Sequence, residues 1–182
     1  MEQSWLGHSP APSPMLKPVK RVKGRLPGAK GKQFAIVASR YNARYVDAML
    51  RAAQAELRKA GVNDIQVIRV PGAYEIPVVV SHLAGRAFRS TPPKPQVPHV
   101  SAIICLGVIL RGETTHAAHI GEAVSRALME IQVRSGIPVI HEVLLLENEA
   151  QARARCLGQK HNRGTEAAQT ALAMAKVMMD LG

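Results

Sequence analysis

The chain has 182 residues, of which 47% are hydrophobic, and a formal net charge of +11. This length and apolar content predict one domain with a substantial core. No apolar run approaches the roughly 20 residues of a membrane span, and no secretion signal is recognisable. The two cysteines lack the spacing of a metal site or a disulfide framework. We therefore expect a soluble, cytoplasmic protein without a metal.

Residues 1–32 form a basic, proline-containing arm that we expect to be disordered or draped over a partner subunit. Removing the charges of its seven lysines and arginines between Leu16 and Gln33 lowers the net charge of +11 to +4. Aromatic residues make up only 3% of the chain, and no nucleic-acid-binding motif accompanies the arm. A solvated arm is therefore favoured over nucleic-acid binding, while a phosphate-rich or acidic partner stays open.

Strand and helix patterns alternate from residue 33 onward. The apolar run Phe34–Ala38 predicts a buried strand, followed by a turn at 39–42 and an amphipathic helix that ends at Gly61. Its apolar face is expected to contain Val46, Met49, Leu50, Ala53 and Leu57. A second strand is expected at 65–70, and a helix from the 71–77 turn to about residue 87. Residues 89–99, with four prolines, are expected to form a loop insertion.

The second half continues the alternation. A strand is expected at 102–110, a helix at 117–133, a strand from 136 to about 145, and helices at 148–155 and 165–179. One face of the helix at 117–133 is expected to contain Ile120, Ala123, Val124, Ala127, Leu128 and Ile131. This order predicts a parallel sheet with helices on both faces. No dinucleotide-binding or Walker-type glycine loop is present.

Three turns follow successive predicted strands, at residues 39–42, 72–76 and 111–116. The carboxyl ends of parallel strands are where such sheets bind ligands, so we expect these turns to share one site. Tyr41 offers a ring for stacking on a planar ligand. Gly72 and Ala73 expose backbone donors and acceptors, and the carboxylate of Glu75 can accept hydrogen bonds from hydroxyls. The alternatives of a core tyrosine and a helix N-terminal carboxylate stay open.

The stretch Gly107–His116 reads as a buried strand that opens into a helix. Gly112 allows close backbone approach, and the residues after it present successive N–H groups, so the turn can hold a phosphate at the helix N-terminus. His116 supplies a titratable ring for proton transfer. A simple helix cap with a surface histidine is the alternative reading.

Residues 155–166 contain a mixed-charge run that usually forms a solvated helix end. Arg155 has a planar guanidinium group, which can donate two hydrogen bonds to a phosphate on a neighbouring surface. Glu166 could orient a histidine. The other charged or titratable members of the run are Lys160, His161 and Arg163.

Four motifs, IVASRYN, VPGAYEIP, GVILRGETTH and HNRGTEAA, resemble those of the lumazine synthase family in order and spacing, over about residues 33 to 180. The resemblance implies a flavodoxin-like, three-layer α/β/α sandwich with a central four-stranded, mainly parallel sheet. It implies pentamers with active sites between neighbouring subunits. It also implies a transferase of riboflavin biosynthesis without a cofactor, and riboflavin synthase as a candidate downstream partner.

The implied reaction condenses 5-amino-6-(D-ribitylamino)uracil with 3,4-dihydroxy-2-butanone 4-phosphate, releasing phosphate, water and 6,7-dimethyl-8-ribityllumazine. By resemblance, Tyr41 stacks on the pyrimidine ring and His116 is the general acid/base. The ribityl chain and ring edge are held by Gly72, Ala73, Tyr74, Glu75 and Ile76. The ring pocket is lined by Val108, Ile109 and Leu110. The phosphate is bound by Glu113, through its N–H because its carboxylate would repel the ligand, by Thr114, and by Arg155 of the adjacent subunit.

The chain departs from common members of the family at several positions. His141, followed by Glu142, stands where the family has an aromatic residue that contacts the ring. This change leaves open a catalytically weak lumazine- or flavin-binding module. Tyr41 replaces the usual phenylalanine or tryptophan and keeps a stacking surface. The arm and the proline-rich insertion are similar to fungal members, and we expect a free pentamer rather than a sixty-subunit shell.

Overall fold

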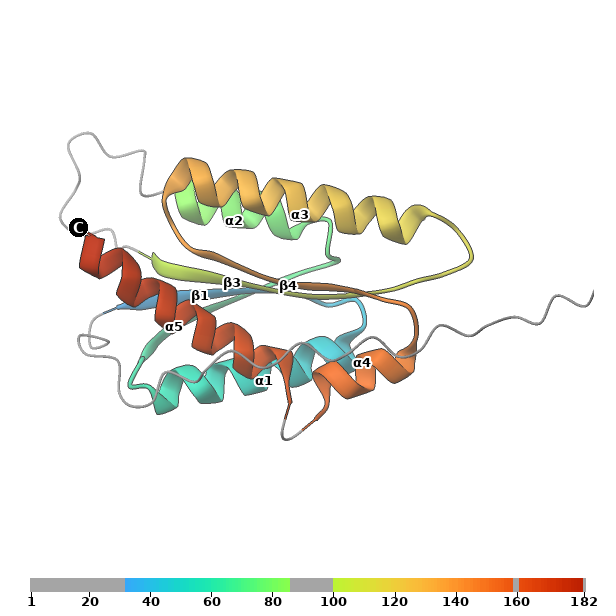
Figure 1. Cartoon of the computed structure of the whole chain (residues 1–182), viewed down its shortest axis with the longest axis horizontal. Coiled ribbons are helices and arrows are strands. Elements are labelled where there is room, and N and C mark those ends of the chain that lie inside the picture. Colours follow the sequence, from blue (N-terminus) through green and yellow to red (C-terminus); the bar gives the residue numbers. More distant parts are fainter. Residues whose placement is uncertain (1–31, 86–99, 159–160, 182) are drawn as a thin grey trace, which may run out of the picture.

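A computed structural model describes residues 32–85, 100–158 and 161–181. Within these ranges a sheet lies between two layers of helices (Figure 1). The arm up to residue 31, the insertion at 89–99 and Lys160 lie outside the described residues. The expectations for those segments therefore stay predictions.

The sheet has the strand order β2-β1-β3-β4, and all its pairings are parallel. The strands are β1 (Gln33–Ser39), β2 (Asp64–Val70), β3 (Val100–Leu110) and β4 (Val139–Leu146). The two central strands, β1 and β3, are almost entirely buried because helices cover both of their faces. The predicted α/β architecture with a four-stranded parallel sheet is confirmed.

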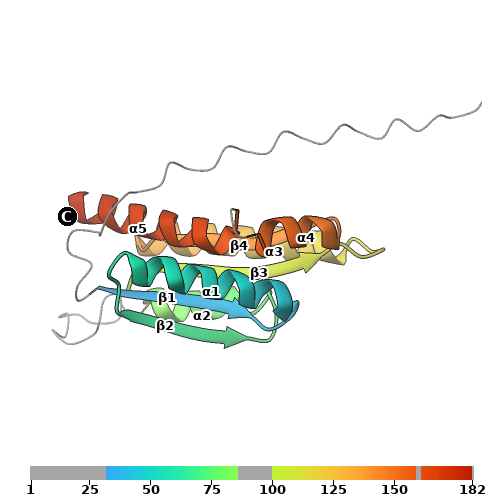
Figure 2. The same ribbon diagram turned by 90° about the horizontal axis from the view of Figure 1, so that it is seen from below.

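Two helical layers enclose the sheet (Figures 1 and 2). One layer contains α1 (Ala43–Lys59), α4 (Glu149–Cys156) and α5 (Arg163–Leu181), and the other contains α2 (Ile76–Gly85) and α3 (His116–Ser135). The predicted apolar face of α1 is confirmed, with Leu50 only half-buried. On the predicted face of α3, Val124 and Leu128 are buried, whereas Ala123 is exposed. None of the helices within the described ranges is long and apolar enough to cross a membrane.

The first turn of α5 crosses α1 at very close range. A Cβ atom added to Gly164 would lie 2.0 Å from the backbone oxygen of Met49. Backbone cannot yield as a flexible side chain can, so only glycine fits at this crossing. The packing of α5 on α1 therefore depends on Gly164.

A buried ion pair fixes the same end of α5 to the sheet. Arg163 donates through Nε and Nη2 to the two carboxylate oxygens of Glu142 on β4, at 2.9 and 2.8 Å, and through Nη1 to Glu166 at 2.7 Å. The side chain of Glu142 is only 8% exposed. Burial raises the pKa of Glu142 to about 7, even though Arg163 and the more distant Arg155 lower it. The expectation that Glu166 orients a histidine is wrong, because its carboxylate accepts a hydrogen bond from Arg163.

We expect Gly164→Ala to lower the free energy of unfolding by about 3 kcal/mol, because α5 must move away from α1 to admit the methyl group. Urea unfolding followed by circular dichroism measures the loss. Gly112→Ala is the matched control, since a Cβ at that exposed position meets nothing within 4 Å. Equal stability of the two variants would show that the crossing tolerates a side chain.

The second prediction concerns Glu142, whose pKa of about 7 in the folded chain lies above its ordinary value of 4.5. The folded chain therefore binds this proton more tightly than the unfolded chain does. The contribution of the protonated carboxyl to the free energy of unfolding is fully present below the ordinary pKa, and it is lost as pH rises through the pKa of the folded chain. Between about pH 5 and about pH 8, we expect the free energy of unfolding of the wild type to fall by on the order of 2 kcal/mol relative to that of Glu142→Gln. Urea unfolding of both proteins across this range measures the difference, and a constant difference contradicts the prediction.

Candidate active site

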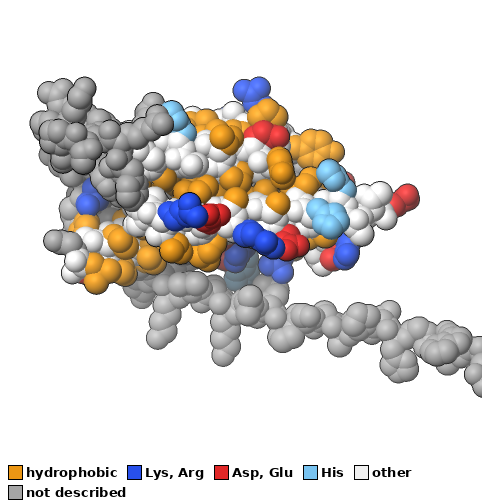
Figure 3. Space-filling model, turned by 90° about the horizontal axis from the view of Figure 1, so that it is seen from above, with side chains coloured by type: hydrophobic (Ala, Val, Ile, Leu, Met, Phe, Trp, Pro, Cys, Tyr) orange, Lys and Arg blue, Asp and Glu red, His pale blue; other side chains and the backbone are white. Residues whose placement is uncertain are grey.

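A cleft of about 610 Å³ lies at the carboxyl ends of the strands and the start of α3. It is lined by Tyr41, Gly72, Ala73, Tyr74, Glu75, Val108, Ile109, His116, His119, Ile120 and Ala123. All three predicted turns or their neighbouring strand ends contribute to this lining, so the expected convergence is observed. Figure 3 views the α2 and α3 face, where histidine side chains gather at one end beside hydrophobic ones.

The turn that carries Tyr41 is attached to the end of β2. The N–H of Arg40 donates to the carbonyl of Val70 at 2.8 Å, and the N–H of Tyr41 donates to Pro71 at 3.1 Å. These bonds place the first turn beside the second. Tyr41 itself is 72% exposed, so the alternative of a core tyrosine is wrong and its ring is available to a ligand.

The second turn is closed on itself. The N–H of Gly72 donates to Oε2 of Glu75 at 2.9 Å, just before α2 begins. The expected free backbone donor at Gly72 is therefore wrong, and the carboxylate of Glu75 takes the helix N-terminal position that was the alternative reading. Ile76 is fully buried in the core against α3 and β3, so it lies beneath the cleft and does not line it.

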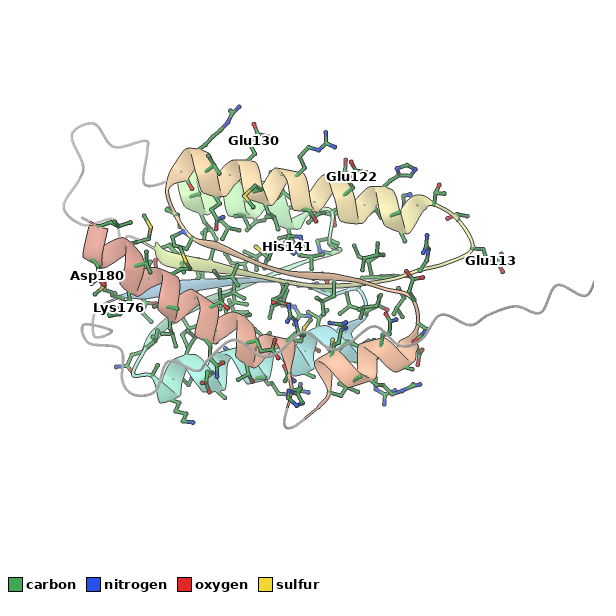
Figure 4. The ribbon with its side chains drawn as sticks, in the orientation of Figure 1. Glu113, Glu122, Glu130, His141, Lys176 and Asp180 are labelled. Atoms are coloured by element: carbon green, nitrogen blue, oxygen red, sulfur yellow. The ribbon has the colours of Figure 1, made fainter. Side chains whose placement is uncertain are left out.

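The third turn leads from β3 to α3. Thr115 is the N-cap residue of α3, and its side chain makes no capping hydrogen bond. Glu113 and Thr114 are exposed and are not among the residues that line the cleft. Figure 4 shows Glu113 at the tip of the turn, pointing away from the body of the molecule. Leu110 packs on the opposite side of the sheet, with the α1, α4 and α5 layer, so its predicted place in the ring pocket is wrong for this subunit.

Two histidines from the first turn of α3 line the cleft. His116 is the first residue of the helix and His119 follows three positions later, on the same helical face. Sequence reasoning singled out His116 and missed His119. The three-residue spacing, within a helix that was predicted, is the signal that identifies the second histidine.

Two predicted site residues lie elsewhere in this subunit. His141 of β4 faces α3, where its Nε2 lies 2.9 Å from Oγ of Ser125, and burial lowers its pKa. Because the hydroxyl of Ser125 donates its hydrogen to Gly121, the imidazole is the donor in this contact. Arg155 is exposed on α4, in the helical layer across the sheet, and makes no salt bridge to any described residue.

The chemistry available in the cleft is stacking, hydrogen bonding and proton transfer. Ile109 and Ile120 supply apolar side chains, while Tyr41 and the histidines supply rings. Val108 also lines the cleft, although its side chain packs with the α1, α4 and α5 layer. Burial raises the pKa of Cys156 to about 11 and raises that of Cys105 further, so neither thiol is a nucleophile at neutral pH. Across residues 32–85, 100–158 and 161–181, no group of three or more His, Cys, Asp or Glu is arranged to hold a metal ion.

Comparison with known proteins places this geometry in a family. A family model described as 6,7-dimethyl-8-ribityllumazine synthase matches residues 31–179. The enzyme of that name from Xylella fastidiosa (strain 9a5c) is 39% identical over 83% of this chain and 92% of its own length. Those from Xanthomonas oryzae pv. oryzae (strain PXO99A) and Stenotrophomonas maltophilia (strain R551-3) are 38% and 36% identical, over 80% and 90% of this chain and 89% and 99% of their own lengths. The chain belongs to the 6,7-dimethyl-8-ribityllumazine synthase family.

Proposed function

We propose that this protein condenses 5-amino-6-(D-ribitylamino)uracil with 3,4-dihydroxy-2-butanone 4-phosphate to give 6,7-dimethyl-8-ribityllumazine, phosphate and water. The observation that carries the proposal is the single cleft lined by Tyr41, Glu75 and His116, which come from three separate turns. A flat ring, a polyol and a proton-transfer step each find a matching group there. Nothing in the described residues favours a binding module without turnover.

The pyrimidine stacks on the exposed ring of Tyr41 and faces the end of β3 at Val108 and Ile109. The ribityl chain lies along the 72–75 turn. Oε2 of Glu75 is occupied by the N–H of Gly72, which holds the carboxylate in place and leaves Oε1 to accept hydrogen bonds from substrate hydroxyls. The closed turn therefore works as a fixed acceptor, and the substrate supplies the donors.

The reaction moves protons at each stage. The 5-amino group adds to the ketone and water leaves to form an imine, after which a proton leaves the neighbouring carbon and the phosphate departs. The ribityl-bearing nitrogen then attacks the remaining carbonyl carbon, and a second water leaves as the ring closes. His116 carries these protons from the first position of α3. The phosphate lies against the 111–115 turn, where N–H groups at the start of an uncapped helix stabilise its charge as it leaves. Glu113 contributes its N–H and Thr114 its hydroxyl, with the carboxylate of Glu113 directed outward (Figure 4).

Arg155 completes the phosphate site of an adjacent subunit in a homo-oligomer, which we take to be a pentamer. Its place on α4, away from the cleft of its own subunit, supports this arrangement. Met129, Val133 and Leu145 expose large apolar side chains along α3 and β4, as expected of a surface that another subunit covers. His141, on the same strand as Leu145, would then reach the neighbouring ring pocket.

We also propose that residues 33–182 form one domain preceded by a basic arm, and that the protein is cytoplasmic. The two free cysteines, Cys105 and Cys156, are both buried, which suits a reducing compartment.

We expect His116→Ala to lower kcat by about 10²- to 10⁴-fold, because a positioned acid/base is lost from the site. Lumazine absorbance at saturating concentrations of both substrates measures the rate. His119→Ala is the matched control from the same helical face, and we expect it to retain most of the activity. A larger loss in His119→Ala than in His116→Ala would transfer the acid/base role to the second histidine.

The interfacial site is tested by mixing two weak variants, His116→Ala and Arg155→Ala. When both are unfolded and refolded together, about a quarter of the interfaces pair an intact His116 of one subunit with an intact Arg155 of its neighbour. We expect the mixture to be several-fold more active than either variant alone. If both residues acted within one subunit, every subunit of the mixture would lack one of them. The activity of the mixture would then be only the average of the activities of the two variants.

A further inference from the structure

Asn42, between Tyr41 and α1, has an unusual backbone and an unusual hydrogen bond. It is the one non-glycine residue among those described with a positive φ, at φ 55° and ψ 40°. Asparagine is among the few residues that adopt this left-handed conformation readily. Its carbonyl accepts from the N–H groups of Tyr45 and Val46 at the start of α1, yet its side chain does not cap that helix. The side-chain amide is therefore free for another contact.

That contact reaches the neighbouring strand, β3. Nδ2 of Asn42 donates to the carbonyl of Val108 at 2.8 Å, over a separation of 66 residues. Pairing between β1 and β3 ends at Ala38 and Leu106, so Val108 lies beyond the last β1 partner. Val108 is only 2% exposed, and its carbonyl needs a donor from the protein. The Asn42 amide supplies the hydrogen bond that a longer β1 would have supplied.

The hydrogen bond connects the Tyr41 turn to a part of β3 that also lines the cleft. Tyr41 and Val108 both line it, and Asn42 follows Tyr41 directly. Since the ring of Tyr41 is largely exposed, packing does not fix its distance from β3. Backbone bonds from Arg40 and Tyr41 attach the turn to β2 and Pro71, on the other side of the turn from β3. The Asn42 amide is the described side-chain hydrogen bond that sets the spacing of the turn from the β3 wall.

We infer that Asn42 is a positioning residue for the pyrimidine substrate, which holds the Tyr41 turn at the spacing from Val108 that a stacked ring requires. This inference rests on the proposed function. It predicts a selective effect: the phosphate lies at the 111–115 turn, which Asn42 does not contact. Loss of the amide should weaken binding of the pyrimidine and leave binding of the phosphate substrate unchanged.

Two substitutions separate the amide from the backbone conformation. Asn42→Gly keeps a positive φ without strain and removes the donor. Asn42→Asp keeps the shape and turns the donor into a carboxylate that repels the carbonyl of Val108. Asn63→Gly and Asn63→Asp, at an exposed position between α1 and β2, are the matched controls.

Calorimetric titration with 5-amino-6-(D-ribitylamino)uracil alone, together with steady-state KM values for both substrates, provides the test. We expect both Asn42 variants to raise the Kd and KM of the pyrimidine about tenfold or more, with the KM of the phosphate substrate within about twofold of wild type. The Asn63 variants should match wild type. An unchanged pyrimidine Kd in Asn42→Gly, or equal losses for both substrates, overturns the inference.

A double-mutant cycle with Tyr41→Ala adds a readout that a purely structural role would not move. If Asn42 acts through the tyrosine, Asn42→Gly should weaken pyrimidine binding far less in the Tyr41→Ala background than in wild type. Additive losses overturn the inference. Failure of the proposed function is distinct from these outcomes, because in that case the wild type itself would bind no pyrimidine and form no lumazine.

Discussion

The unequal length of β1 and β3 is the constraint on which the cleft depends. β1 stops pairing at Ala38, opposite Leu106, whereas β3 continues to Leu110 beside β4. A parallel sheet with equal strands would close this edge with a further ladder of hydrogen bonds. Here the step leaves Val108 and Ile109 as a wall, and the chain after β1 turns across the gap. Asn42, which donates to the carbonyl of Val108 beyond the last β1–β3 pair, also sets the width of the site.

A second constraint acts at the far helical layer. Arg163 lies between two carboxylates, and Glu142 and Glu166 raise its pKa although burial lowers it. Asn162, which directly precedes Arg163, donates to the carbonyl of Cys156 at the end of α4. The ion pair therefore fixes the start of α5 and the end of α4 together on β4. Arg155 precedes Cys156 directly, so its position relative to the sheet depends on a charge network that is distant from the cleft.

Sequence patterns predicted what depends on neighbours along the chain. Apolar runs located the central strands, and the turns after them located the candidate site, because parallel strands end at one edge. The patterns failed where a contact comes from a distant segment. Ile76 and Leu110 belong to recognisable motifs, but a motif does not state which face of a strand or helix turns to the core. Helical spacing placed Ala123 on one face with Val124 and Leu128, but it did not show that Ala123 is exposed and lines the cleft.

The contacts that the sequence did not predict also join segments that are distant along the chain. The partner of Asn42 lies 66 residues away and the ion pair of Glu142 spans 21 residues. No local pattern signals either bond. His119 is different, because its spacing from His116 is visible once the helix is assigned. Local periodicity thus predicts where a site lies, whereas the bonds that set its dimensions require the folded chain.

Charge in the cleft bears on how the phosphate is bound. The described residues that line it include two histidines and one carboxylate but no lysine or arginine. Arg111, the first residue of the 111–115 turn, does not line the cleft, and its Nη1 lies 3.0 Å from both carboxylate oxygens of Glu147. Backbone N–H groups and a helix dipole stabilise a bound phosphate, but a departing dianion gains more from a charged, bidentate donor. In the proposed site one subunit thus supplies the ring, the histidine and the backbone N–H groups, and the proposed second subunit supplies a cation through Arg155, which is exposed and makes no salt bridge among the described residues.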